Sequence, residues 1–233
     1  MGKHKFVLLA GLVVLIAMGG VMLLRGLGSN SSTGEAIAGG VPDPEEVRKI
    51  KATIVEAWKV GYIATQLTHD VSQFPSVFVD DPHVPLTPKQ QEELRGWLGT
   101  VPKGAGYLTY SIAAFHNTER LNRLSQDAWA KATAAGRDYL IPEDYLTPEE
   151  LKEIQESNRP IPTPPAMVRQ PTMSAEEYVK WTWENTRFES VIINGDRAVV
   201  LYDDHWFLNE DILVRRDGKW YVAGHRRVGA SRW

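Results

Sequence analysis

The densest group of residues that could carry chemistry is Asp203-Asp204-His205, which is followed by Glu210-Asp211. Alternation along a strand would place Asp203 and His205 on the same face. A histidine with a carboxylate beside it can act as a general base, so His205 would be the base and Asp203 the residue that orients it. Aspartates are equally common at hairpin ends, where they accept backbone N–H bonds. Two interpretations therefore stand: a general-base pair in a cavity, or a polar rim at a hairpin end.

A second polar group, Asp80-Asp81-x-His83, has the oxygen and imidazole ligands that a metal site uses. A turn before Pro82 accounts for both acids without a metal, so we expect no metal site and no cofactor. The chain contains no cysteine, which excludes thiolate zinc sites, disulfides and cysteine nucleophiles. No motif for a serine hydrolase, a zinc protease, a phosphate-binding loop or a dinucleotide-binding fold is present. The net charge of −3 predicts no nucleic-acid partner.

Aromatic residues form the third group of candidates. Trp58, Tyr62, Trp206 and Trp220 could line a pocket for an apolar ligand, because such pockets are built mainly from aromatic and aliphatic side chains. The alternative is ordinary core packing, in which each large ring buries ~150–250 Å². The regular elements around Trp58 and Trp220 favour core packing for these two.

The C-terminal stretch shows the clearest pattern of the elements that must position these residues. Ser174-Ala175-Glu176-Glu177 is typical of a helix start, because the serine and the last glutamate can cap each other's backbone N–H groups. Asn-Gly and Asp-Gly pairs between β-rich runs are strong hairpin signals. The pattern predicts strands at 187–193, 197–207, 210–216 and 219–226, with turns at 194–196, 208–209 and 217–218. We therefore expect an antiparallel meander that packs one face on helices.

Helices are expected between residues 43 and 158. Asp43-Pro44-Glu45-Glu46 is a helix start with an N-cap aspartate and a proline in the first turn, and the helix should fade near His69-Asp70. Phe74 to Val79 is expected to form a short strand. Thr87-Pro88-Lys89-Gln90 starts a helix that Gly99 stops. Further helices are expected at 107–135, with a break near 116–117, and from 148, and the proline-rich segment 159–171 is expected to be an extended spacer.

The N-terminal segment predicts a membrane anchor. Phe6 to Leu24 comprises 19 residues without a charge, and at ~1.5 Å per residue this helix would match a bilayer core. Lys3 and Lys5 precede it and favour a cytoplasmic N-terminus. A cleaved signal is the alternative, but the small-x-small site at residues 36–38 lies too far downstream. The sequence predicts a single-pass protein of the cell membrane: a tail and anchor at 1–25, a flexible tether at 26–42 and an extracytoplasmic domain at 43–233.

The order of these elements resembles the NTF2-like (SnoaL-like, cystatin-like cone) family. The resemblance covers 43–81 and 174–228 and rests on a long first helix, a short strand that ends at Asp80-Asp81-Pro82, and a closing meander that contains Gly218-Lys219-Trp220. It implies an α+β fold in which a curved antiparallel sheet wraps around helices and leaves a cavity. Residues 83–172 depart from that plan and are interpreted as a helical insertion. The predicted fold class is thus an NTF2-like cone with an insertion, preceded by one transmembrane helix.

The function predicted from these features is a membrane-anchored, extracytoplasmic binding or assembly module that is not an enzyme. Its partners would be the lipid bilayer, through Phe6 to Leu24, and either a protein of a membrane complex or an apolar small molecule. Two alternatives stay open. One is a SnoaL-like hydrolase or isomerase that uses His205 and Asp203. The other is a VirB8-like subunit of a membrane assembly, since that family shares the order of tail, span and exported cone.

Overall fold

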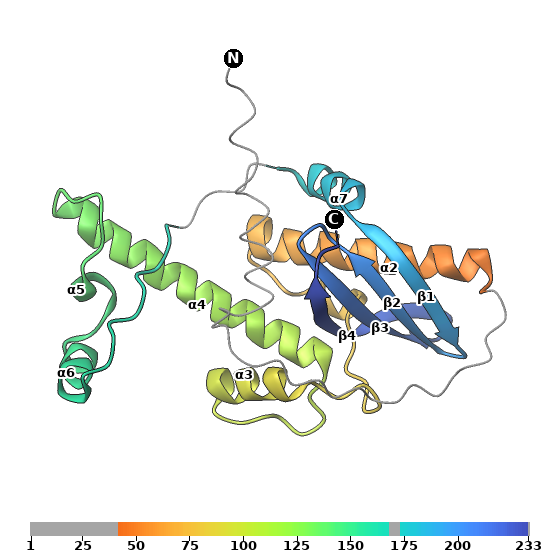
Figure 1. Cartoon of the computed structure of the whole chain (residues 1–233), viewed down its shortest axis with the longest axis horizontal. Helices are drawn as coiled ribbons and strands as arrows, with labels where there is room; N and C mark the ends of the chain where they lie inside the picture. Colours follow the sequence, from red (N-terminus) through yellow and green to blue (C-terminus); the bar gives the residue numbers. More distant parts are fainter. Residues whose placement is uncertain (1–41, 168–172, 233) are drawn as a thin grey trace, which may run out of the picture. The chain divides into compact units, whose positions relative to one another are not determined.

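Four consecutive strands form one antiparallel sheet in the order β1-β2-β3-β4 (Figure 1). The computed structural model describes residues 42–167 and 173–232. The strands are β1 (Arg187–Asn194), β2 (Arg197–Asp203), β3 (Phe207–Arg216) and β4 (Lys219–Ala230). Gly195, Asp217 and Gly218 have positive φ angles of 59°, 51° and 77°, which is the backbone that tight hairpin turns require. The predicted meander and its Asn-Gly and Asp-Gly turns are confirmed.

The turn between β2 and β3 lies at residues 204–206, so the predicted turn at Leu208-Asn209 is wrong. Asp204 Oδ1 accepts hydrogen bonds from the backbone N–H groups of Trp206 at 3.0 Å and Phe207 at 2.7 Å. His205 takes a left-handed conformation with φ 75°. The aspartate side chain replaces the missing strand partners of these N–H groups, and β2 therefore ends at Asp203.

Helix α2 (Pro44–Tyr62) packs across one face of the sheet (Figure 1) and continues as a π-helix, Ile63–Thr68. Asp43 caps its start by accepting the N–H of Glu45, as predicted. Ile50 and Ile54 are fully buried against the sheet, which is the apolar face that the spacing predicted. Helix α7 (Ala175–Glu184) lies along α2 and begins with the predicted capping box at Ser174.

The segment Phe74 to Val79 is not a strand, which corrects the prediction. Phe74–Ser76 is a short 3₁₀ helix, and Phe78 makes a single parallel bridge to Val222 of β4. Phe74, Val77 and Phe78 are all buried, and their spacing of three and four residues suits a helical turn. The β-rich composition of the segment therefore reflects burial and not extension.

Helices α3 (Pro88–Leu98) and α4 (Tyr107–Ala134) follow. The capping box at Thr87 and the stop at Gly99, whose φ is 76°, are confirmed. Leu94, Tyr107 and Tyr110 are buried in the same core as α2 and the sheet. The chain accordingly divides into one unit that includes residues up to 115 and from 172 onward, and a second unit, His116–Pro171. The part of the predicted insertion between residues 83 and 115 thus contributes to the first core.

The second unit is held by a buried ion pair and by contacts to its proline-rich segment. It comprises the end of α4, which runs through 116–117 without the expected break, α5 (Pro142–Tyr145) and α6 (Pro148–Ser157). Arg137 donates two hydrogen bonds, 2.7 and 2.8 Å long, to the carboxylate of Asp144. The guanidinium and the Ile141 N–H lower the pKa of Asp144 to about 2. Trp129 Nε1 donates to the carbonyl of Pro165, which anchors the extended segment on α4.

The transmembrane helix in the predicted fold class is not supported. The α+β class with an antiparallel sheet packed on helices agrees with the structure. Among residues 42–167 and 173–232, however, no helix is long and apolar enough to cross a membrane. Even α4, with 28 residues, carries charges along its length. The segment Phe6 to Leu24, from which the helix was predicted, and the tether at 26–41 lie outside the described residues.

The close approach of Gly106 to Asp80 generates a stability prediction. Asp80 accepts the backbone N–H of Thr109 at 3.0 Å and so caps the start of α4, while a Cβ at position 106 would lie 2.8 Å from the Asp80 Cα. We expect Gly106→Ala to lower the free energy of unfolding by about 1–3 kcal/mol, because the backbone of Asp80 must move. Urea unfolding measures the change.

Gly96→Ala is the matched control, because nothing lies within 4 Å of a Cβ at that exposed helical position. This variant should be about 0.5–1 kcal/mol more stable than the parent chain, because alanine favours helix more than glycine does. Equal effects of the two substitutions would contradict the role assigned to the contact with Asp80.

Candidate functional site

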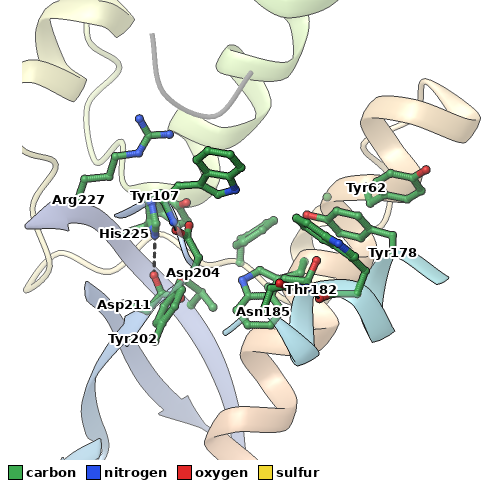
Figure 2. A pocket seen from close by; sticks show the side chains of 17 residues that line it. Tyr62, Tyr107, Tyr178, Thr182, Asn185, Tyr202, Asp204, Asp211, His225 and Arg227 are labelled. Atoms are coloured by element: carbon green, nitrogen blue, oxygen red, sulfur yellow. Dashed lines mark hydrogen bonds and ion pairs between the residues drawn. The ribbon is translucent and has the colours of Figure 1, made fainter. Parts of the chain in front are cut away.

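A cavity of about 100 Å³ lies between the sheet and the two helices α2 and α7 (Figure 2). Tyr62, Tyr178, Thr182 and Asn185 form the helical wall, and the side chains from β2, β3 and β4 form the opposite wall. Eight of the 17 lining residues carry a Trp, Tyr or Phe ring: Trp58, Tyr62, Phe78, Tyr107, Tyr178, Trp181, Tyr202 and Trp206. Such a lining suits an apolar ligand better than a charged one.

Three of the four aromatic residues predicted to line a pocket do so. Trp58, Tyr62 and Trp206 contribute to the cavity wall. Trp220 does not: it is 2% exposed, and its Nε1 donates to Glu46 Oε2 at 3.0 Å. This bond ties β4 to α2, and Trp220 belongs to the core, as the alternative interpretation proposed.

The helical wall is held in shape by stacked rings. The rings of Tyr62 and Tyr178 lie 4.2 Å apart and are inclined by 10°, and the Tyr62 hydroxyl donates to the carbonyl of Met173 at 2.7 Å. Across the cavity floor, Trp58 packs edge-on against Tyr202 at 5.7 Å. Rigid rings fixed in this way leave space that they cannot fill by changing rotamer.

The polar end of the cavity is a histidine–aspartate pair that the sequence analysis did not identify. His225 Nδ1 lies 2.7 Å from Asp211 Oδ1, and the Tyr202 hydroxyl donates to Asp211 Oδ2 at 3.3 Å (Figure 2). The side chain of Asp211 is 5% exposed and that of His225 is 24% exposed. A buried carboxylate therefore orients an imidazole that solvent and ligands can reach.

A β-bulge brings this pair together. From the turn to Leu213↔Val222 the strands β3 and β4 pair regularly, but Ile212 then pairs with Gly224 and leaves Ala223 without a partner. The bulge places Asp211 opposite His225, whereas an uninterrupted ladder would place it opposite Gly224. It also reverses the alternation of faces along β4. Val222, His225 and Arg227 consequently line the cavity, and Ala223 packs on the other face with Val84 and Val214.

The predicted pair Asp203 and His205 lies at the hairpin end. Asp203 is fully buried, and its carboxylate accepts the backbone N–H groups of His205 at 3.0 Å and Arg232 at 2.7 Å. Burial acts to raise the pKa of Asp203, but the hydrogen bonds from Arg232, Ser231 and His205 outweigh it and hold the pKa below its ordinary value. His205 is exposed, and neither residue is part of the cavity wall. The intervening residue, Asp204, does line it.

The acids of the predicted metal fragment have structural partners. Asp80 caps α4, and Asp81 accepts the N–H of His83 at 2.8 Å and pairs with Arg216 at 3.2 Å. These contacts hold the pKa of Asp81 below its ordinary value, against the effect of burial. In the described part of the chain, no three histidine or acidic side chains are grouped so that they could hold a metal ion.

The hydroxyl groups of the cavity stay protonated over a wide pH range. Burial raises the pKa of Tyr178 to about 12 and also raises the pKa values of Tyr107 and Tyr202. Burial lowers the pKa of Arg227, whose guanidinium lies 4.0 Å from the centre of the Phe207 ring. The cavity therefore combines neutral hydroxyls and aromatic faces with the few charged groups at its sheet end.

Comparison of the chain with protein-family models, curated proteins and solved structures finds no match. The resemblance to the NTF2-like family therefore stays a prediction from the order of the elements.

The raised pKa of Tyr178 predicts a loss of stability in alkali. Tyr178 holds its proton more tightly in the folded chain than in the unfolded chain. The stability that this difference contributes is fully present below pH ~10 and is lost as the pH rises towards 12. We expect Tyr178→Phe to gain stability relative to the parent chain, by about 2 kcal/mol, between these two pH values. Urea unfolding at a series of pH values measures the difference.

Tyr139→Phe is the control for this measurement, because Tyr139 is 58% exposed. Its stability should follow that of the parent chain throughout. Parallel curves for the parent chain and Tyr178→Phe would show that the phenol of Tyr178 ionises normally and would contradict the prediction.

Proposed function

We propose that the domain binds a small, mostly apolar molecule in the cavity between the sheet and helices α2 and α7. The observation that supports this proposal is an aromatic cavity that ends at the Asp211–His225 pair, of which only the aspartate is buried. A pocket with an apolar body and a few convergent polar groups is typical of small-molecule sites. The same features support the binding module expected from the sequence and favour a small molecule over a protein as its partner.

The size of the cavity limits the ligand to a single ring or a short chain. An apolar protein cavity of ~150 Å³ accommodates benzene, and this cavity measures about 100 Å³. A ligand of about eight non-hydrogen atoms, at ~0.5–1 kcal/mol per atom, would bind with a Kd on the order of 1 μM to 1 mM. Binding should therefore be measured by methods that detect weak complexes.

A cavity-filling variant tests the proposal. Thr182 lines the helical wall, so Thr182→Phe should fill the cavity and weaken binding of toluene and phenol by at least about tenfold. Lys180→Phe is the matched control on the same helix, because the Lys180 side chain is 77% exposed. Ligand-observed NMR measures binding, and circular dichroism confirms that both variants fold. Unchanged binding to Thr182→Phe, or no binding by the parent chain, would reject the cavity as the site.

Acid–base catalysis is the second candidate function, and the Asp211–His225 pair is the observation that favours it. The predicted hydrolase or isomerase assigned these roles to His205 and Asp203, which do not line the cavity. His225 could remove a proton from the carbon next to a carbonyl group and return it after exchange with solvent.

Deuterium exchange into cyclohexanone in D₂O tests this candidate by NMR. The protein should accelerate exchange by about 10² or more over buffer, and His225→Leu should remove the acceleration. Equal rates for the parent chain, His225→Leu and buffer would reject catalysis and leave the binding proposal intact.

A further inference from the structure

The hydrogen-bond partners of Asp211 determine which ring nitrogen of His225 carries a proton. A carboxylate only accepts hydrogen bonds, so at 2.7 Å from Asp211 Oδ1 the Nδ1 atom of His225 must be the donor. In the neutral ring, Nε2 then has no proton and is an acceptor. No side chain or backbone group of residues 42–167 and 173–232 hydrogen-bonds to Nε2. The Nε2 atom of His225 is therefore a hydrogen-bond acceptor that a ligand in the cavity can use.

The same cavity contains a donor without an acceptor. Trp206 lines the wall, and its indole Nε1 is buried and has no hydrogen-bond partner within the described residues. A buried N–H is almost always paired in folded proteins, so this group is left for a ligand or a water. The ligand should accordingly offer one acceptor as well as one donor.

A hydroxyl group is the simplest group that both donates and accepts. A carbonyl or ether oxygen cannot donate to Nε2, and an ammonium group cannot accept from the indole. A carboxylate ligand is also disfavoured, because the carboxylates of Asp204 and Asp211 line the cavity, where Arg227 is the one permanent positive charge among the described residues. The stacked Tyr62 and Tyr178 rings offer a flat apolar wall for the rest of the molecule.

We infer that the ligand is a hydroxylated single-ring compound of the phenol class, whose hydroxyl donates to His225 Nε2 and accepts from Trp206 Nε1. This inference rests on the proposed binding function and names the ligand class for the same cavity. Asp211 acts through His225, because its hydrogen bond with Nδ1 fixes the tautomer of the ring.

Titration of the full chain with phenol, anisole, toluene and benzoate tests the inference by ligand-observed NMR. Phenol should bind about 3- to 10-fold more tightly than anisole or toluene, the net effect of one or two hydrogen bonds. The ¹⁵N resonance of His225 Nε2 should shift on addition of phenol and stay unchanged with toluene. His225→Leu should abolish the preference for phenol and leave toluene binding within about twofold of the parent chain.

Arg226→Leu is the matched control, since Arg226 follows His225 on β4 and pairs with Glu210 on the exposed side. It should retain the full preference for phenol. If His225→Leu does not fold, Trp206→Phe provides the second variant, with the same expected loss of the phenol preference. Equal binding of phenol, anisole and toluene, or tightest binding of benzoate, would overturn the hydroxyl assignment while the binding function stands. Failure of all four compounds to bind would overturn both.

Discussion

The unpaired Ala223 on β4 decides which side chains meet in the cavity. Strand residues alternate between faces, so one extra residue transfers every later side chain to the opposite face. Up to Val222 the strand directs alternate residues into the core, and beyond Ala223 the same inward face receives His225 and Arg227. The polar end of the cavity is therefore a consequence of backbone geometry, and Asp211 gains its histidine partner only because the ladder shifts by one.

The aromatic walls explain why the space at this point is not closed by packing. Trp58, Tyr62 and Tyr178 are rigid rings whose positions are fixed by mutual stacking and by the hydrogen bond from Tyr62 to the carbonyl of Met173. Flexible aliphatic chains could collapse into a gap of this size, whereas fixed rings leave it open. The bond from Trp220 to Glu46 ties β4 to the first turn of α2.

Local signals in the sequence predicted the elements well, and contacts between distant residues account for the errors. The caps at Asp43, Thr87 and Ser174 and the Asp217-Gly218 turn each depend on a few adjacent residues, and all were found. The bulge at Ala223 was not predicted, although Gly224 inside the strand is a residue type that often marks a bulge. The Asp217-Gly218 turn could have revealed the pair. Counting residues outward from this turn along β3 and β4 places His225 within one residue of the position opposite Asp211. What the count cannot supply is the extra residue on β4 that turns His225 to the inward face, which Asp211 already occupies on β3.

The aspartates of the β2–β3 hairpin have different roles, depending on where they lie along the strands. Asp203 uses its carboxylate to accept the N–H of Arg232, which ties the residues after β4 to the end of β2. Asp204 shapes the turn that carries Trp206 to the cavity wall. Asp211 lies in the middle of β3, where backbone groups are already paired, so its carboxylate is available to a side chain across the ladder. A carboxylate near a chain reversal is used by backbone N–H groups, and one inside a regular strand can orient an imidazole. Position in the ladder, more than residue type, therefore separates the structural aspartates from the one at the site.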